Sequence, residues 1–286
     1  MRLATKRRAE WLISSYCDEG MSHHVRMAGE WIEVTEMGQG DPIVLVPGLA
    51  GGWKLLAPLV HLLARDHRVI TYNLRGDRYP TATARPRDLG DLAHDLGSLI
   101  EQLCLERPAV FGVSFGGAIA LQLAVEQPQR LGALVVQGAE SRFRTTLGAT
   151  IARRVLERFP LPSDNRFVNQ FFNLLHGGKP EPGPLVDFVV ERCWETDQSV
   201  IAQRIALLET YDVTDRLWQI DVPTLILAGS RDVIVPPARQ QALASAIPGA
   251  SFELLDGAGH VGFLTHRTEV VRRVRKMLGT LKHSPC

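Results

Sequence analysis

A serine flanked by glycines follows a short apolar run in this chain of 286 residues. Ser114 lies in the segment Phe111-Gly112-Val113-Ser114-Phe115-Gly116-Gly117. The apolar run 109–113 and the helical pattern 115–126 predict a strand, a sharp turn and a helix, which is the context of an exposed serine nucleophile. Glycines lie two residues before and two residues after the serine, and their lack of a side chain leaves room for the strand and the helix to approach each other at such a turn. A glycine-rich turn with an incidental serine is the simpler interpretation, but it does not account for all of these features together.

The serine would need a base, because its hydroxyl is a weak nucleophile near neutral pH. Of the nine histidines, His260 lies in a loop of mostly small residues, 256–262, directly after a predicted strand. The others fall in helical patterns, near strand boundaries or in segments without supporting context. A structural role remains the alternative for His260, and we expect it to be the general base that accepts the serine proton.

The base in turn needs a group that orients its ring, and two acids are candidates. Asp232 follows the predicted strand 224–227, and carboxyl ends of parallel strands are where catalytic groups gather in open sheets. A turn aspartate or a helix cap is the alternative role for Asp232. Glu140 is a rival acid, because it follows the predicted strand 133–136. We expect Asp232 to be the partner of the histidine.

The elements around these residues alternate between strands and helices. An opening hairpin, 24–27 and 31–35 around Gly29, predicts an antiparallel start, and 43–46 is a continuous apolar run typical of a strand buried on both faces. The alternation that follows predicts right-handed crossovers and a mostly parallel central sheet with helices on both faces. Helices are expected at 53–64, 89–104, 115–126, 238–246 and 269–281, and further strands at 68–72, 109–113, 133–136, 224–227 and 251–255.

The alternation stops between residues 140 and 218, where helical patterns are interrupted by proline-rich segments at 159–162 and 179–184. We therefore expect a leader at 1–21, an α/β core formed by 22–139 and 219–286, and a helical cap or lid formed by 140–218. The cap should pack over the strand ends, where an open sheet presents its site. At helical spacing most of its large apolar residues should be core, and the rest would line a pocket: Phe167, Phe171, Phe172, Leu174, Leu175, Phe188, Val189 and Trp194.

Composition excludes several other classes of function. The formal charge of +1 provides no global field for nucleic acid, and the basic runs near both ends are typical of solvated helix faces. No apolar run approaches the ~20 residues of a membrane span, and the N-terminus lacks the apolar core of a signal peptide. The four cysteines show neither a CxxC pair nor metal-ligand spacing, so reduced thiols in a cytoplasmic protein are expected.

With the order Ser114, Asp232, His260, the chain resembles the α/β-hydrolase superfamily over roughly residues 22–282. The resemblance implies an α/β-hydrolase fold and an oxyanion hole made by the backbone N–H groups of Leu49 and Phe115. Members commonly have His-Gly in the loop before the first of these donors, whereas this chain has Pro47-Gly48, a change that affects loop geometry more than chemistry.

A second departure lies in the segment 72–78, Tyr-Asn-Leu-Arg-Gly-Asp-Arg, where relatives often begin with aspartate and continue Arg-Gly-x-Gly. Loop salt bridges are the common use of such charges, so Arg75 and Asp77 are interpreted as residues that shape the loop rather than as catalytic groups.

These residues predict a serine hydrolase that cleaves a carboxylic ester or lactone through an acyl-enzyme, with no metal or organic cofactor. The expected partner is a small-molecule substrate with an apolar portion, and the oligomeric state is left open. Carbon-carbon bond hydrolysis, amide hydrolysis and cofactor-free perhydrolysis use a similar triad on this scaffold and remain alternatives. A receptor-like protein that keeps the fold to capture a ligand is the alternative outside catalysis.

Overall fold

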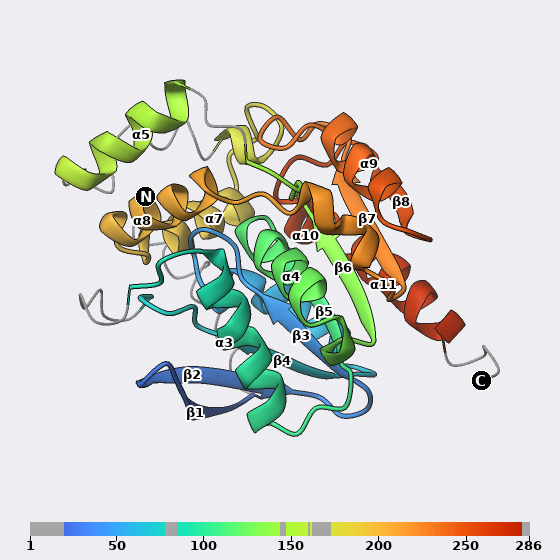
Figure 1. Cartoon of the computed structure of the whole chain (residues 1–286). Coiled ribbons are helices and arrows are strands. Elements are labelled where there is room, and N and C mark those ends of the chain that lie inside the picture. The colour runs from blue at the N-terminus through green and yellow to red at the C-terminus, as the bar shows by residue number, and fades with distance from the viewer. Residues whose placement is uncertain (1–19, 78–84, 144–146, 160, 162–172, 282–286) are drawn as a thin grey trace.

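The computed structural model describes residues 20–77, 85–143, 147–159, 161 and 173–281 (Figure 1). The predicted leader therefore lies almost entirely outside the described residues, as do the cap residues Phe167, Phe171 and Phe172.

Eight strands form one sheet within the described residues, in the order β1-β2-β4-β3-β5-β6-β7-β8. All pairs from β4 to β8 are parallel. The order reverses between β3 and β5, which creates a switch point where open α/β sheets place their sites. The strands are β1 (Met21–Met27), β2 (Glu30–Met37), β3 (Pro42–Val46), β4 (Arg68–Tyr72), β5 (Ala109–Val113), β6 (Ala133–Gln137), β7 (Thr224–Gly229) and β8 (Ser251–Leu255).

The first two strands form the predicted antiparallel hairpin, and β2 also pairs antiparallel with β4. The turn between them, Ala28-Gly29, has positive φ at both residues, 48° and 87°, as a two-residue hairpin turn requires. The central strands β5, β6 and β7 are buried along their whole length, which agrees with the continuous apolar runs in the sequence.

Helices cover both faces of the sheet, as predicted (Figure 1). The helices α3 (Leu89–Gln102), α4 (Phe115–Glu126) and α9 (Pro237–Ala246) pack on one face. The helices α2 (Ala57–Leu63), α10 (Gly262–Thr265) and α11 (Arg267–Leu281) pack on the other. The expected helix 53–64 is instead a 3-10 turn, η1 (Trp53–Leu56), followed by α2. Pro58 lies in the first turn of α2, where its missing N–H costs nothing, so the α-helix begins there and not earlier.

A helical segment lies between β6 and β7, where the insertion was predicted. It contains α5 (Leu147–Arg158), α7 (Pro184–Trp194), α8 (Gln198–Glu209) and a 3-10 turn, η4 (Thr214–Gln219). Figure 1 shows α5, α7 and α8 grouped at one end of the sheet. Of the apolar residues singled out there, Phe188 and Val189 are buried, whereas Leu175 and Trp194 are partly buried and Leu174 is exposed. We call residues 140–218 the insertion; that it is a domain separate from the core stays a prediction.

None of the helices in the described part of the chain is both long enough and apolar enough to cross a membrane.

Candidate active site

The turn between β5 and α4 holds Ser114 in a strained conformation, with φ 53° and ψ −117°. Such positive φ values are uncommon in residues with a side chain and persist only where the surroundings enforce them. Here the Ser114 N–H donates to the Gln137 carbonyl at 2.8 Å, and the Ser114 carbonyl accepts from the N–H of Gly117 at 2.8 Å. The chain therefore makes the sharp strand-to-helix turn that the sequence predicted around this serine.

The glycines around the serine are required by close approach of the backbone. A Cβ on Gly116 would lie 2.2 Å from the Val46 carbonyl oxygen and 2.4 Å from that of Pro47. A Cβ on Gly112 would lie 2.3 Å from the Gly116 carbonyl oxygen. No side chain can rotate to relieve these contacts, because the clashing atoms belong to the backbone.

Gly116→Ala is therefore expected to lower the free energy of unfolding by ~3 kcal/mol or more, because β3 and α4 would have to separate. Urea unfolding followed by circular dichroism measures this change. Gly279→Ala in α11 is the matched control, since its Cβ would meet nothing within 4 Å and should stabilise by up to ~1 kcal/mol. Equal stabilities of the Gly116→Ala and wild-type proteins would contradict the close approach.

The structure brings the three predicted side chains together in one hydrogen-bonded chain. His260 Nε2 lies 2.8 Å from Ser114 Oγ, and His260 Nδ1 lies 2.9 Å from Asp232 Oδ2. Asp232 and His260 are 2% and 5% exposed, so their contact is shielded from water, whereas Ser114 is partly exposed. With Asp232 ionised, Nδ1 carries the proton and Nε2 faces the serine as an acceptor. This is the arrangement in which imidazole can take a proton from the hydroxyl.

The carboxylate of Asp232 is held by the backbone that follows it. Its Oδ1 accepts from the N–H groups of Ile234 and Val235 at 2.9 and 3.0 Å, which leaves Oδ2 for the histidine. The turn role that the sequence offered as an alternative for Asp232 is thus present, but it uses the other oxygen. The two roles are compatible because a carboxylate has acceptor sites on both oxygens.

Glu140, the rival acid, lies elsewhere. Its carboxylate is paired with Arg239 of α9 at 3.2 Å, and the acid beside His260 is Asp232. Glu140, which follows β6, lies against α9. Asp232, which follows β7, lies against the loop that contains His260. The structure therefore favours Asp232 over Glu140 as the partner of the histidine.

Two glutamines hold the loops of the site, and sequence reasoning missed both because no local pattern marks them. Gln137, at the end of β6, donates to the His260 carbonyl at 2.8 Å and accepts from the Phe263 N–H at 3.0 Å. Gln240 of α9 accepts from the Gly138 N–H at 2.9 Å and donates to the Val235 carbonyl at 2.8 Å. Both are fully buried. Only the tertiary structure shows which backbone groups these amides satisfy.

The insertion also packs against the histidine loop. The Val261 N–H donates to the Leu175 carbonyl at 3.0 Å, and a Cβ on Gly259 would lie 2.2 Å from the backbone carbon of His176. This contact explains why a residue without a side chain precedes His260.

The loop after β3 contains the first of the predicted oxyanion donors. Leu49 is partly buried, and Phe115 is buried at the first position of α4. The N–H groups at the first turn of a helix have no partner inside that helix, so the Phe115 N–H is available by its position. In the part of the chain that is described, the Leu49 carbonyl has a partner, Arg204 of α8, at 2.9 Å.

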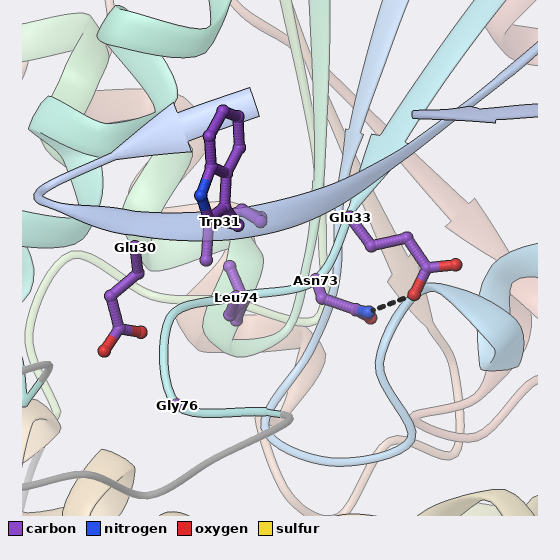
Figure 2. A pocket seen from close by; sticks show the side chains of 7 residues that line it. Glu30, Trp31, Glu33, Asn73, Leu74 and Gly76 are labelled. Atoms are coloured by element: carbon purple, nitrogen blue, oxygen red, sulfur yellow. Dashed lines mark hydrogen bonds between the residues drawn. The ribbon is translucent and has the colours of Figure 1, made fainter. Parts of the chain in front are cut away.

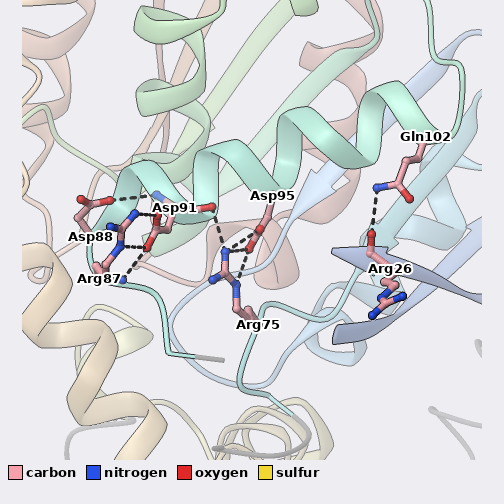
Figure 3. Close-up of polar contacts among 7 residues, drawn as sticks. All are labelled: Arg26, Arg75, Arg87, Asp88, Asp91, Asp95 and Gln102. Atoms are coloured by element: carbon pink, nitrogen blue, oxygen red, sulfur yellow. Dashed lines mark hydrogen bonds and ion pairs between the residues drawn. The ribbon is translucent and has the colours of Figure 1, made fainter. Parts of the chain in front are cut away.

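The charged residues after β4 form ion pairs. Arg75 donates through Nε and Nη2 to the carboxylate of Asp95 in α3, and both side chains are almost buried (Figure 3). Asp77 pairs with Arg204 at 2.8 Å. Arg87 and Asp91 form a further pair at the start of α3 (Figure 3). These contacts agree with the interpretation of Arg75 and Asp77 as residues that shape the loop.

A surface pocket is lined by residues of β2 in the hairpin and of the segment after β4 (Figure 2). Its lining includes Trp31, Glu33 and Asn73, and Asn73 Nδ2 donates to Glu33 Oε2 at 3.2 Å. None of the three predicted catalytic residues lines it, so this pocket is distinct from the candidate active site.

Two of the four cysteines lie in the described part of the chain, Cys104 and Cys193. Burial raises the pKa of the Cys193 thiol to about 12, so it stays protonated near neutral pH. Cys104 is exposed, and Cys17 and Cys286 lie outside the described residues. Within those residues no group of three or more His, Cys, Asp or Glu side chains is arranged to hold a metal ion.

Known proteins resemble this chain over most of its length. RutD of Pseudomonas syringae, a protein named for carbamate hydrolysis, is 28% identical and the match covers 83% of this chain and 93% of that protein. A pimeloyl-acyl-carrier-protein methyl ester esterase of Aliivibrio salmonicida is 26% identical, with 84% and 93% covered.

Among solved structures, an esterase from Exiguobacterium antarcticum superimposes with a TM-score of 0.79 at 22% identity, covering 92% of this chain and all of that one. An enol-lactonase from Burkholderia xenovorans gives 0.77 at 20% identity, with 90% and 100% covered. At these identities the structures establish the fold alone. The model of the alpha/beta hydrolase fold family matches residues 41–267. This match, together with the sheet order and the predicted resemblance that it confirms, shows that the chain belongs to the alpha/beta hydrolase fold family.

Proposed function

We propose that this protein is a serine hydrolase that cleaves a carboxylic ester or lactone through an acyl-enzyme. The observation that carries the proposal is the hydrogen-bond chain from Ser114 Oγ through His260 to the buried Asp232, with distances of 2.8 and 2.9 Å. These three groups have the types and contacts that nucleophilic catalysis by a serine requires.

In the first half of the reaction, Ser114 Oγ attacks the substrate carbonyl carbon while its proton passes to His260 Nε2. The carbon-oxygen bond to the leaving alcohol then breaks, and the imidazolium returns the proton to that alcohol oxygen. Asp232 holds the ring in the productive tautomer and stabilises its positive charge. In the second half, water attacks the acyl group, loses a proton to His260, and the acid leaves as Ser114 recovers its proton.

The negative oxygen formed in each half needs donors that are already in place. By position, these are the backbone N–H groups of Leu49 and Phe115, one from the loop after β3 and one from the start of α4. Preorganised donors of this kind contribute ~10²–10³ each to the rate, since they act on charge that exists only in the transition state.

The proposed substrate is a small ester or lactone with an apolar portion. Leu175 and Trp194 of the insertion pack against the core and are only partly buried, and this apolar surface supports an apolar contact. The names of the relatives, an esterase and RutD, support acyl chemistry on an ester or a carbamate. A carbamate is the second candidate, because the same attack on a carbonyl carbon would cleave it.

A panel of p-nitrophenyl esters of increasing acyl length, with p-nitrophenyl carbamates beside it, tests the proposal. We expect turnover of at least one ester, with a preference that changes with acyl length. A serine-directed phosphonate should also leave one adduct, on Ser114, by peptide mass spectrometry. Failure to hydrolyse any member together with no adduct would favour the receptor-like alternative, in which the fold captures a ligand without attacking it.

A further inference from the structure

The insertion contacts the loop after β3 at two backbone groups. The Gly51 N–H donates to Thr196 Oγ1 at 2.9 Å, and Thr196 lies in the turn between α7 and α8. Thr196 is only 4% exposed, so water does not compete for this hydrogen bond. We call residues 48–52 the oxyanion loop, because Leu49 is the donor proposed for the transition state.

The second contact comes from Arg204 of α8. Its Nη1 donates to the Leu49 carbonyl at 2.9 Å and its Nη2 to Asp77 Oδ1 at 2.8 Å. Its guanidinium carbon also lies 5.9 Å from the centre of the Phe115 ring, within range of a cation–π contact. One side chain, 2% exposed, therefore touches both residues that would supply the oxyanion donors.

The position of Arg204 is itself fixed. Asp77 uses its other oxygen, Oδ2, to accept from the Leu74 N–H at 2.9 Å, which holds the carboxylate against the backbone after β4. A planar guanidinium can satisfy the Leu49 carbonyl and Asp77 at once because its donors diverge in a rigid fork. Arg204 thus links the backbone that follows β4 to the oxyanion loop.

The oxyanion loop needs such external contacts. It contains Gly48, Gly51 and Gly52, and the last two have φ of 84° and 52°. Glycine permits many backbone conformations, so this sequence does not itself specify where the Leu49 N–H points. A donor stabilises the transition state only when it lies within a narrow range of distance from the developing anion.

We propose that Thr196 and Arg204 are positioning residues that hold the oxyanion loop in its catalytic geometry, so that the insertion sets the rate of the chemical step. This inference rests on the proposed function. Neither residue is expected to contact the substrate; each acts through the backbone of residues 48–52.

The sharpest test replaces the Thr196 hydroxyl. Thr196→Val keeps the shape but removes the acceptor, and we expect kcat to fall about tenfold to a hundredfold, with KM within about twofold of the wild type. The shape of the pH–rate profile should stay the same, because Ser114, His260 and Asp232 are untouched. Thr196→Ser keeps the hydroxyl and should retain kcat within about threefold. Thr210→Val is the matched control, since that hydroxyl donates to the Leu207 carbonyl at the end of its own helix.

Arg204→Lys provides the second variant. A lysine keeps the positive charge, but its ammonium group lacks the two diverging donors with which the guanidinium bridges the Leu49 carbonyl and Asp77. It should lower kcat at least as much as Thr196→Val, and both variants should increase amide hydrogen exchange at residues 48–52. An unchanged kcat in Thr196→Val, or equal losses in the Val and Ser variants, would overturn the positioning role. The failure of the proposed function looks different: the wild-type protein itself would then show neither turnover nor a phosphonate adduct.

Discussion

Ser114→Ala is expected to lower kcat for p-nitrophenyl ester hydrolysis by ~10⁵- to 10⁶-fold, to a level set by the remaining binding and oxyanion contacts. The reason is that an alanine side chain offers no atom to form the acyl bond, while His260 and Asp232 would remain paired at 2.9 Å. Because the strained turn is enforced by backbone contacts, alanine should be accommodated at φ 53° about as well as serine.

The measurement is initial rate on the best ester of the panel, beside phosphonate labelling followed by mass spectrometry. The thermal midpoint of unfolding serves as the control and should stay within a few degrees of the wild type. Substantial hydrolysis by a well-folded Ser114→Ala protein would remove this serine from the mechanism, and would direct attention to a water molecule activated by His260.

Asp232→Asn is expected to lower kcat by ~10⁴-fold at neutral pH. The asparagine can keep Oδ1 on the Ile234 and Val235 N–H groups, so the fold should be retained. Its amide nitrogen then faces His260 Nδ1 and donates to it, which reverses the ring tautomer and places a proton on Nε2. The histidine can then no longer accept the proton of the serine, and the imidazolium loses its counter-charge.

Glu140→Gln is the matched control for this carboxylate. It removes a partly exposed ion pair with Arg239, and such pairs are worth ~0–1 kcal/mol of stability, so kcat should stay within about twofold. Near-normal turnover by Asp232→Asn, joined to a large loss in Glu140→Gln, would assign the orienting role to Glu140 instead.

The fold was predictable to a large extent because its signals are local. A buried parallel strand has a continuous apolar run, and a helix that covers a sheet has an apolar face, so β5, β6 and β7 could be read from the sequence with nearly correct ends. The short helix after Trp53 was less predictable. There the apolar pattern continues across a 3-10 turn, and only Pro58 marks the start of α2.

The candidate triad was predictable for a related reason. Each member lies beside a turn with its own local signature: glycines around Ser114, small residues around His260, and the end of a buried strand before Asp232. The sequence favoured Asp232 over Glu140 but left Glu140 open as a rival, because both acids follow strands. In the folded chain Asp232 contacts His260 and Glu140 contacts Arg239, and these contacts are not marked in the local sequence.

By itself, the sequence was enough to predict a serine nucleophile with a base and an acid, because each of these candidates is marked by residues a few positions away. The tertiary structure decided how those groups and the oxyanion loop are held. Gln137, Gln240, Thr196 and Arg204 have no local signature, since each contributes by satisfying a backbone or side-chain group that is distant in the sequence. The physical reason is that a buried polar group must find a partner, and the partner is fixed only when the chain has folded.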